Sequence, residues 1–196
     1  MPTRYNELQL DALRELANIG SGTASTALSQ MLARPVDISV PTAKSLSFAD
    51  AVDAIGPAET EVHAVVLGIA GDLDGCVLLL LSDDATTTLC GMLGVDAESE
   101  IGLSALGEIA NIVGTSYLNS LAAMTGVAIE PTTPALTVDM LGAIVASLLV
   151  GAVGSDDLAL VLDSELEVEG ENCSIAFLLL PNPEGVDELL ARMGMS

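Results

Sequence analysis

The strongest constraint on the fold is a segment that occurs twice in the chain, at positions 93 residues apart. One copy begins at Ala12 and reads ALRELANIGSGTASTALSQMLARPVDISVP; the other begins at Ala105 and reads ALGEIANIVGTSYLNSLAAMTGVAIEPTTP. The identical pairs include Leu13/Leu106, Glu15/Glu108, Ala17/Ala110, Asn18/Asn111, Ile19/Ile112, Leu28/Leu121, Met31/Met124 and Pro41/Pro134. A gapless duplication predicts two copies of one structural unit. We therefore expect residues 1–196 to form a single domain of two repeats, about 6–98 and 99–193.

Each copy opens with a pattern typical of a long helix. In the first copy, apolar residues recur at steps of three and four over residues 10–31, which is the spacing of a buried helix face. Asn6 and Gln9 have the spacing of an N-terminal capping box. Pro35 is expected to end the first helix and Gly126 the second.

Strand-like runs follow each helix. The expected strands of the first half are 36–46, 61–70 and 75–81, with a turn at 71–75 and a helix at 83–93 that Ser82 caps. Those of the second half are 127–137 and a hairpin of 157–168 with 173–180, followed by a helix at 183–193 that begins with Pro. The run 140–153 is ambiguous, and its continuous apolar character favours a buried helix.

Both halves thus have the order helix, strands, helix. We predict an α/β sandwich in which strands of both halves form one antiparallel-rich sheet, related by an internal pseudo-two-fold. The two long helices are expected to expose similar faces.

The charge excludes several classes of partner. The 196 residues include 28 Asp and Glu but only 5 Lys and Arg, a formal charge of −23. Such a chain repels nucleic acid and anionic lipid surfaces, and it lacks the aromatic residues on which single-stranded nucleic acids stack. Half of the residues are hydrophobic (51%), so the chain is not a disordered acidic tail.

The acidity, with Lys44 as the only Lys, also resembles that of proteins from organisms with molar internal salt. At about 1 M salt the Debye length is roughly 3 Å, so a self-repelling surface is tolerated. The alternative is an ordinary acidic protein. The halophilic interpretation predicts that stability and activity rise with salt.

The remaining sequence signals point to the cytoplasm. Residues 1–10 carry no apolar signal-peptide core, and the longest near-apolar run, 141–154, is too short to span a bilayer. Cys76, Cys90 and Cys173 lack metal-site or CxxC spacing, so we interpret them as buried thiols of a reducing compartment.

Conventional catalytic motifs are not found. His63 is the only histidine, and it lies in an apolar strand pattern, where a packing or capping role is expected. Residues 20–23, Gly-Ser-Gly-Thr, have the composition of a phosphate loop but fall within a helical pattern and lack a Lys. Zinc chemistry and covalent catalysis of the usual kinds are therefore not expected.

One polar pattern recurs in both halves at the same spacing. It consists of an Asp or Ser, a Glu four residues later, an Asn three residues after that, and a Pro 23 residues further on. The residues are Asp11, Glu15, Asn18 and Pro41, and Ser104, Glu108, Asn111 and Pro134. Steps of four and three keep side chains on one helix face. A single Glu-x2-Asn pair is usually solvated surface, but its recurrence with the Pro predicts a functional patch.

This pattern, [D/S]-x3-E-x2-N followed by Pro, resembles the signature of the CheC/CheX/FliY family of chemotaxis phosphatases. The stretch 15–22, ELANIGSG, with Ala27-Leu28-Ser29 resembles the CheC type most closely. The resemblance covers most of the chain, and both motif copies are intact, whereas CheX-type members usually keep one site. FliY would carry an additional flagellar-switch domain. With its acidity, the chain resembles a halophilic member of the family.

The resemblance implies dephosphorylation of the phosphorylated response regulator CheY. The regulator supplies the aspartyl phosphate, Mg²⁺ and a Lys, so the phosphatase is expected to need no cofactor or metal of its own. Glu15 or Glu108 would pair with that Lys, and Asn18 or Asn111 would orient a water for in-line attack.

Asp11 and Ser104 are expected to support these side chains or touch the partner, and Pro41 and Pro134 to fix the backbone where the chain leaves each helix. The resemblance implies the deamidase CheD as a second partner, with no residues assigned to it. A non-catalytic adaptor that binds CheD or CheY-phosphate is the main alternative, and a structural protein of the flagellar switch is a weaker one. Gly20 and Gly22 correspond to Val113 and Thr115, so the two sites need not be equally active.

Overall fold

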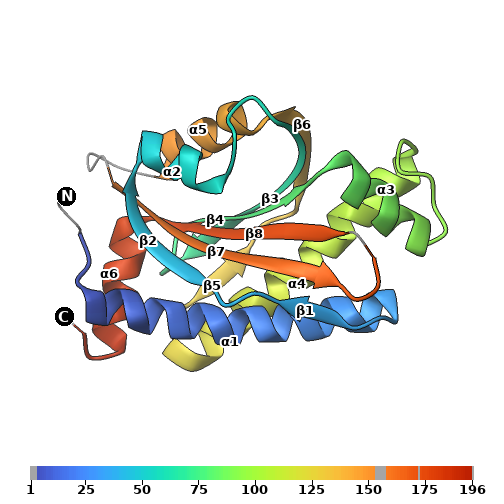
Figure 1. Ribbon diagram of the computed structural model, residues 1–196. Coiled ribbons are helices and arrows are strands. Elements are labelled where there is room, and N and C mark those ends of the chain that lie inside the picture. Colours follow the sequence, from blue (N-terminus) through green and yellow to red (C-terminus); the bar gives the residue numbers. More distant parts are fainter. Residues whose placement is uncertain (1–3, 153–157, 172, 196) are drawn as a thin grey trace.

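The order of helices and strands repeats itself along the chain in the computed structural model, which describes residues 4–152, 158–171 and 173–195 (Figure 1). The first half contains α1 (Glu7–Leu32), β1 (Val36–Ile38), β2 (Thr42–Ser47), α2 (Phe48–Ile55), β3 (Glu61–Gly71), β4 (Gly75–Leu81) and α3 (Asp83–Met92). The second half contains α4 (Glu100–Thr125), β5 (Ile129–Pro131), β6 (Ala135–Met140), α5 (Leu141–Ala152), β7 (Leu158–Val168), β8 (Ser174–Pro181) and α6 (Pro183–Arg192).

The strands of both halves form one sheet in the order β1-β7-β8-β4-β3-β5, with β2 also on β7 and β6 also on β3. The pairings given by the described residues are all antiparallel. The halves are interlocked, because β1 and β2 of the first half pair with β7 of the second, and β5 and β6 of the second pair with β3 of the first. The order of equivalent strands is therefore the same from both edges of the sheet, and the pseudo-two-fold axis passes between β4 and β8.

Helices cover both faces of the sheet. In Figure 1, α1 and α4 run along one face and α2 and α5 lie over the other. The larger core fills the space between α1, α4 and the sheet, with Leu28, Leu118 and Leu79 among its fully buried side chains. A second core, which includes Val145 and Leu78, lies beneath α5. The prediction of an α/β sandwich with a duplicated, antiparallel sheet is confirmed.

The sequence-encoded caps define both long helices. Asn6 and Gln9 exchange hydrogen bonds between side chain and backbone at 2.9 and 3.0 Å, which is the expected capping box. Ser99 caps α4 by accepting the Gly102 N–H. At the C-termini, Ala33 and Gly126 adopt left-handed conformations, with φ of 53° and 73°.

The two long helices contact each other closely because a glycine faces an aromatic ring. A Cβ at Gly20 would lie 2.8 Å from the Tyr117 ring. Tyr117 is buried, and its ring packs on Phe177 of β8 with a centroid distance of 4.7 Å. Two residues later, a Cβ at Gly22 would meet no heavy atom within 4 Å, so this position faces open space. Gly20 is thus a position of close approach between the helices, and Gly22 is not.

Several sequence-predicted boundaries are wrong. The expected strand 36–46 is two strands, β1 and β2, and the expected strand 127–137 is likewise β5 and β6. In each case a three-residue loop separates the two strands. The helix α2 was not predicted, although Ser47 caps it by accepting the Asp50 N–H. In the ambiguous run 140–153, Met140 is the last residue of β6, and Leu141–Ala152 form the helix α5.

Other predicted elements are confirmed. The turn 71–75 joins β3 to β4, with Gly71 and Gly75 at φ of 117° and 140°. The helices α3 and α6 and the hairpin of β7 and β8 lie within one or two residues of their expected ranges. Val153, Asp157 and Asn172, which bordered these predictions, lie outside the described residues. None of the helices in the described part of the chain combines the length and apolar character needed to cross a bilayer.

Candidate functional site

The two motif copies lie on the outward faces of α1 and α4. Glu15 and Asn18 are exposed on α1, and Glu108 is exposed on α4, whereas Asn111 is partly buried. Asp11 and Ser104, one turn before each Glu, are also exposed. The structure therefore brings the helical motif residues of each copy onto one accessible surface, with the apolar side of the same helix facing the core.

The second copy borders an open cleft of about 540 Å³. One wall is α4, and the other is the loop between β5 and β6 with the first part of β6. The lining residues are Leu103, Ser104, Gly107, Glu108, Asn111, Pro131, Thr132, Thr133, Pro134 and Leu136. All four predicted residues of this copy, Pro134 included, thus surround one cleft that is large enough to admit side chains of a partner.

The loop that forms the second wall is held in the same way in both halves. Thr132 donates its N–H to the Gly68 carbonyl at 2.8 Å, and its hydroxyl accepts the Gly68 N–H at 3.0 Å. In the first half, Ser39 makes the matching pair of bonds with Glu165 at 2.9 and 2.8 Å. A hydroxyl side chain three residues after the start of each short strand thereby fixes the loop against the sheet.

Pro41 and Pro134 end these loops. We expected them where the chain leaves each long helix. They lie instead immediately before β2 and β6. Pro41 is buried and Pro134 is partly buried. Proline suits the position because the loop residue before β2 or β6 needs no backbone N–H for the sheet ladder.

The surroundings of the two copies differ at two further positions, which were not predicted from sequence as site residues. Thr115, one turn after Asn111, donates its hydroxyl to the Asn111 side-chain oxygen at 3.4 Å. Arg14, one residue before Glu15, forms an ion pair with Asp11 at 2.7 Å between Nη1 and Oδ1. Both follow the helical steps of three and four that define the motif, and this spacing could have identified them.

The other groups considered from the sequence lie elsewhere. His63 Nε2 is 2.9 Å from Asp83 at the start of α3, and its Nδ1 is buried with no hydrogen-bond partner among the described residues. Burial raises the pKa of the Cys76 and Cys173 thiols to about 11. Within the described part of the chain, His, Cys, Asp and Glu form no group of three or more that could hold a metal ion.

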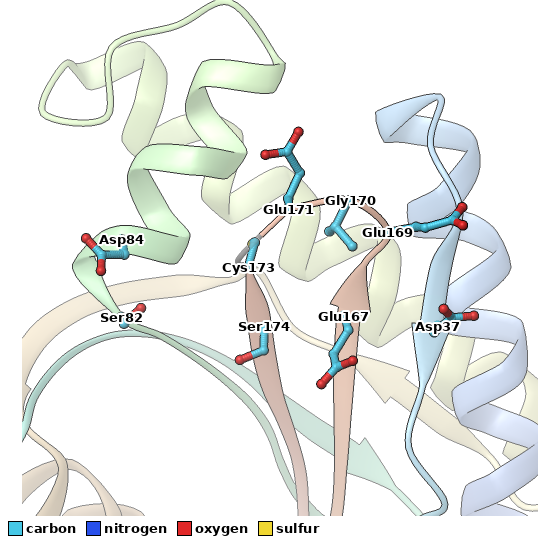
Figure 2. A pocket seen from close by; sticks show the side chains of 10 residues that line it. Asp37, Ser82, Asp84, Glu167, Glu169, Gly170, Glu171, Cys173 and Ser174 are labelled. Carbon is cyan, nitrogen blue, oxygen red and sulfur yellow. The ribbon is translucent and has the colours of Figure 1, made fainter.

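A second open cavity, of about 510 Å³, lies at the end of the sheet where β7 turns into β8 (Figure 2). Its lining includes the five carboxylates of Asp37, Asp84, Glu167, Glu169 and Glu171. Figure 2 shows these side chains arranged around the cavity from β1, α3, the end of β7 and the β7–β8 turn. None of the motif residues lines this cavity, so it is separate from the candidate site.

The fold and the doubled motif define the class of protein: two helix-and-strand units sharing one antiparallel sheet, each presenting a Glu-x2-Asn pair on its long helix. The sequence pattern of the CheC-like family matches residues 8–45 and 101–138, which are the two copies. CheY-P phosphatase CheC of Bacillus subtilis is 32% identical over 97% of this chain and 96% of that protein. The chain belongs to the CheC-like family, as its resemblance indicated.

Solved structures with the same fold agree with this assignment. FliY of Thermotoga maritima superimposes with a TM-score of 0.76 over 99% of this chain and all of that one, at 21% identity. CheX in the complex of CheX, CheY, BeF3 and Mg²⁺ from Borrelia burgdorferi gives a TM-score of 0.52 over 83% of this chain and 95% of that one, at 18% identity. At these identities the likeness describes the fold.

Proposed function

We propose that this chain is a chemotaxis phosphatase that removes the phosphoryl group from phosphorylated CheY. The observation that carries the proposal is the Glu-x2-Asn pair, presented on exposed helix faces in both copies of a chain 32% identical to CheY-P phosphatase CheC. A CheX of the same fold has been solved with CheY, BeF3 and Mg²⁺, which gives a structural precedent for the partner.

The proposed chemistry uses groups from both proteins. A water attacks the phosphorus of the regulator's aspartyl phosphate, the bond from phosphorus to the aspartyl oxygen breaks, and the products are inorganic phosphate and a free carboxylate. Asn18 or Asn111 accepts and donates hydrogen bonds that hold the water in line, which is a positioning role. Glu15 or Glu108 pairs with a Lys of the regulator. The Mg²⁺ belongs to the phosphorylated substrate.

The exposed apolar side chains around the motif favour a protein partner. Leu8 and Ile101, three residues before Asp11 and Ser104, are 67% and 68% exposed. The steps of three, four and three from each of them to the Asn place them on the motif face. Ile19 adds another exposed apolar side chain beside Asn18. Apolar side chains that flank charged and amide groups are suited to the interface with a folded regulator.

The remaining expectations belong to this proposal. CheD stays an expected second partner, and the described residues assign it no surface. A cytoplasmic location fits a partner that is a signalling regulator. Asp11 and Ser104 stay predicted supporting residues, and Pro41 and Pro134 are expected to act by fixing the loop beside each motif.

Phosphate release tests the proposal. A CheY-type regulator from the same organism is phosphorylated with acetyl phosphate and Mg²⁺ at high salt, with CheY of Bacillus subtilis as a second substrate. The protein should accelerate release, and the quadruple alanine variant of Glu15, Asn18, Glu108 and Asn111 should lose about 100-fold or more of that acceleration, because the water is no longer positioned. Asn119→Ala is the matched control, an exposed Asn two turns further along α4.

Two outcomes would contradict the proposal. If folded protein gives no acceleration over autohydrolysis, the phosphatase function is wrong. If the protein binds the regulator equally well before and after the quadruple substitution and releases no phosphate, the adaptor alternative is favoured.

A further inference from the structure

The two copies of the site differ at the helix positions that face the cleft. In the second copy, α4 lines the cleft with Ser104 and Gly107 in addition to Glu108 and Asn111. The positions 93 residues earlier hold Asp11 and Arg14. The proposed functional pair is thus unchanged, whereas its two small neighbours are replaced by a carboxylate and a long cationic side chain.

Gly107 leaves the space beside the motif open. A Cβ at Gly107 would meet no heavy atom within 4 Å, so the helix surface there is free. In the first copy the equivalent position holds Arg14, one turn before Asn18 on the same side of α1, so a long side chain stands where the second copy has none. Asp11 holds the guanidinium at 2.7 Å, and both side chains of this pair are exposed on the motif side of α1.

The Arg14–Asp11 pair affects an approaching regulator in two ways. Its bulk occupies the side of the motif that is empty in the second copy. The positive charge of Arg14 lies one residue before Glu15 along the helix and is partly offset by the Asp11 carboxylate. The remaining positive charge would oppose the regulator's Lys, which Glu15 would attract. The charge effect weakens as salt shortens the Debye length from about 10 Å at 0.1 M to about 3 Å at 1 M. The steric effect does not depend on salt.

We propose that Arg14, held by Asp11, restricts access of the regulator to the first copy of the site, so that the second copy binds and dephosphorylates most of it. The inference rests on the proposed function and makes Arg14 a specificity-determining residue that acts on binding. The quantity that should change is therefore the KM for the phosphorylated regulator at the first copy, with kcat largely unaltered.

The experiment isolates each copy with an Asn→Ala substitution in the full chain. Asn111→Ala should lower kcat/KM about tenfold, whereas Asn18→Ala should lower it less than about threefold. In the Asn111→Ala background, Arg14→Gly should lower the KM about threefold or more with kcat nearly constant. Arg14→Gln keeps most of the bulk without the charge, and its effect on KM should fade between 0.1 and 2 M KCl.

Two further variants provide controls. Arg34 is a half-exposed Arg that forms an ion pair with Glu171. In the Asn111→Ala background, Arg34→Gly removes this ion pair and should leave KM unchanged. In the reverse direction, Ser104→Asp with Gly107→Arg transfers the pair to the second copy, where the open space accepts it, and should raise KM in the Asn18→Ala background.

The outcomes separate the inference from the proposed function. An active protein in which Asn18→Ala and Asn111→Ala cause equal losses, or in which Arg14→Gly leaves KM unchanged, would overturn the role of Arg14 alone. A protein that accelerates no phosphate release in any background would overturn the proposed function together with it.

Discussion

Single hydrogen bonds distinguish residues that are identical in the two copies. Asn111 is partly buried and receives the Thr115 hydroxyl, whereas Asn18 is exposed and has Gly22 at the matching position. A side-chain amide that must orient a water is more effective when its own orientation is restricted, because less conformational freedom is lost in the reactive complex. We therefore expect Thr115 to act as a positioning residue for Asn111 in the second copy.

Thr115→Val should lower kcat at the second copy. The substitution keeps the shape and removes one hydrogen bond of the kind that contributes about 0.5–1.5 kcal/mol, which corresponds to a two- to tenfold decrease. KM should change little, since the exposed binding surface is unaltered. The measurement is steady-state phosphate release in the Asn18→Ala background. An unchanged kcat would show that Asn111 is oriented by the partner instead.

A second prediction concerns Asp163 on β7. Partial burial raises the pKa of its carboxyl, the nearby Lys44 opposes the shift and Glu165 adds to it. The folded state thus holds the proton to higher pH than the unfolded state does, so this group makes the protein less stable as pH rises above its unfolded pKa. Asp163→Asn should raise the free energy of unfolding at pH 7 and have little effect below about pH 3.5, where both states are protonated.

Urea unfolding at pH 7 and below about pH 3.5 measures this effect. The experiment uses 1 M KCl, because salt suppresses the general gain in stability that follows from removing any negative charge. Asp53→Asn, at an exposed position of α2, is the control for that general gain. Equal stabilisation by both substitutions at pH 7 would mean that burial of Asp163 has no measurable cost.

At the scale of elements, the contact of α1 with α4 depends on which helix carries the small residue. Gly20 admits the Tyr117 ring, and the matching position on α4 is Val113, which is buried. A similar exchange occurs beneath the helices. Ser21 and Ser164 form a buried hydrogen bond at 3.0 Å, whereas Gly114, the counterpart of Ser21, packs against Leu67. Each half therefore fills the equivalent space with a different pair of residues, Ser21 with Ser164 in one and Gly114 with Leu67 in the other.

Gly20→Ala and Gly22→Ala should have opposite effects on stability. The added methyl at Gly20 collides with a ring that is itself packed on Phe177, and overpacking of this kind costs about 1–3 kcal/mol. At Gly22 the methyl meets nothing, so the better helix propensity of Ala should stabilise by up to about 1 kcal/mol. Thermal or urea unfolding of the two variants checks both signs, and destabilisation by both would contradict the packing described for Tyr117.

Most elements could be predicted from sequence because their signals are local. Asn6 with Gln9, Ser82 and Gly126 mark helix ends, and the glycines at 71 and 75 mark a turn. The helix α2 was missed because its eight residues follow directly on a strand and are too short for a periodic pattern. The breaks at 39–41 and 132–134 depend on hydroxyl bonds to strands far along the chain, which no local signal reports.

The candidate site was predictable only in part. Recurrence located Glu15, Asn18, Glu108 and Asn111 on one face of each helix. The cleft could not be predicted, because its second wall is a loop brought to α4 by its pairing with β3. Arg14 has the helical spacing of the motif, but the role proposed for it was not evident from sequence. An Arg beside a Glu is ordinary in a helix until the equivalent Gly107 is seen to face open space.

At the scale of the whole molecule, the net charge is −23, and some of the negative side chains lie close together. Asp37 and Glu167 lie directly opposite each other on neighbouring strands, an arrangement in which like charges are destabilising. Both line the acidic cavity of Figure 2 together with three further carboxylates. Added salt should relieve this repulsion by screening.

The free energy of unfolding should therefore rise between 0.1 and 2 M KCl. Glu167→Lys, which places a cation opposite Asp37, should stabilise at 0.1 M KCl by about 0.2–1 kcal/mol and by less at 2 M. Urea unfolding in a KCl series measures both effects. Undiminished stability at 0.1 M KCl would contradict the halophilic interpretation of the composition and leave the family assignment intact.

The interlocked sheet has a genetic consequence. Because β1 and β2 complete the sheet of the opposite half, neither half retains its edge strands without the other. A pair of identical half-length chains could build the same sheet, but every mutation in their gene would then alter both sites at once. Joining the halves in one reading frame lets a codon change at position 14 leave position 107 untouched. Covalent fusion thus keeps the architecture symmetric while each site acquires its own evolutionary history.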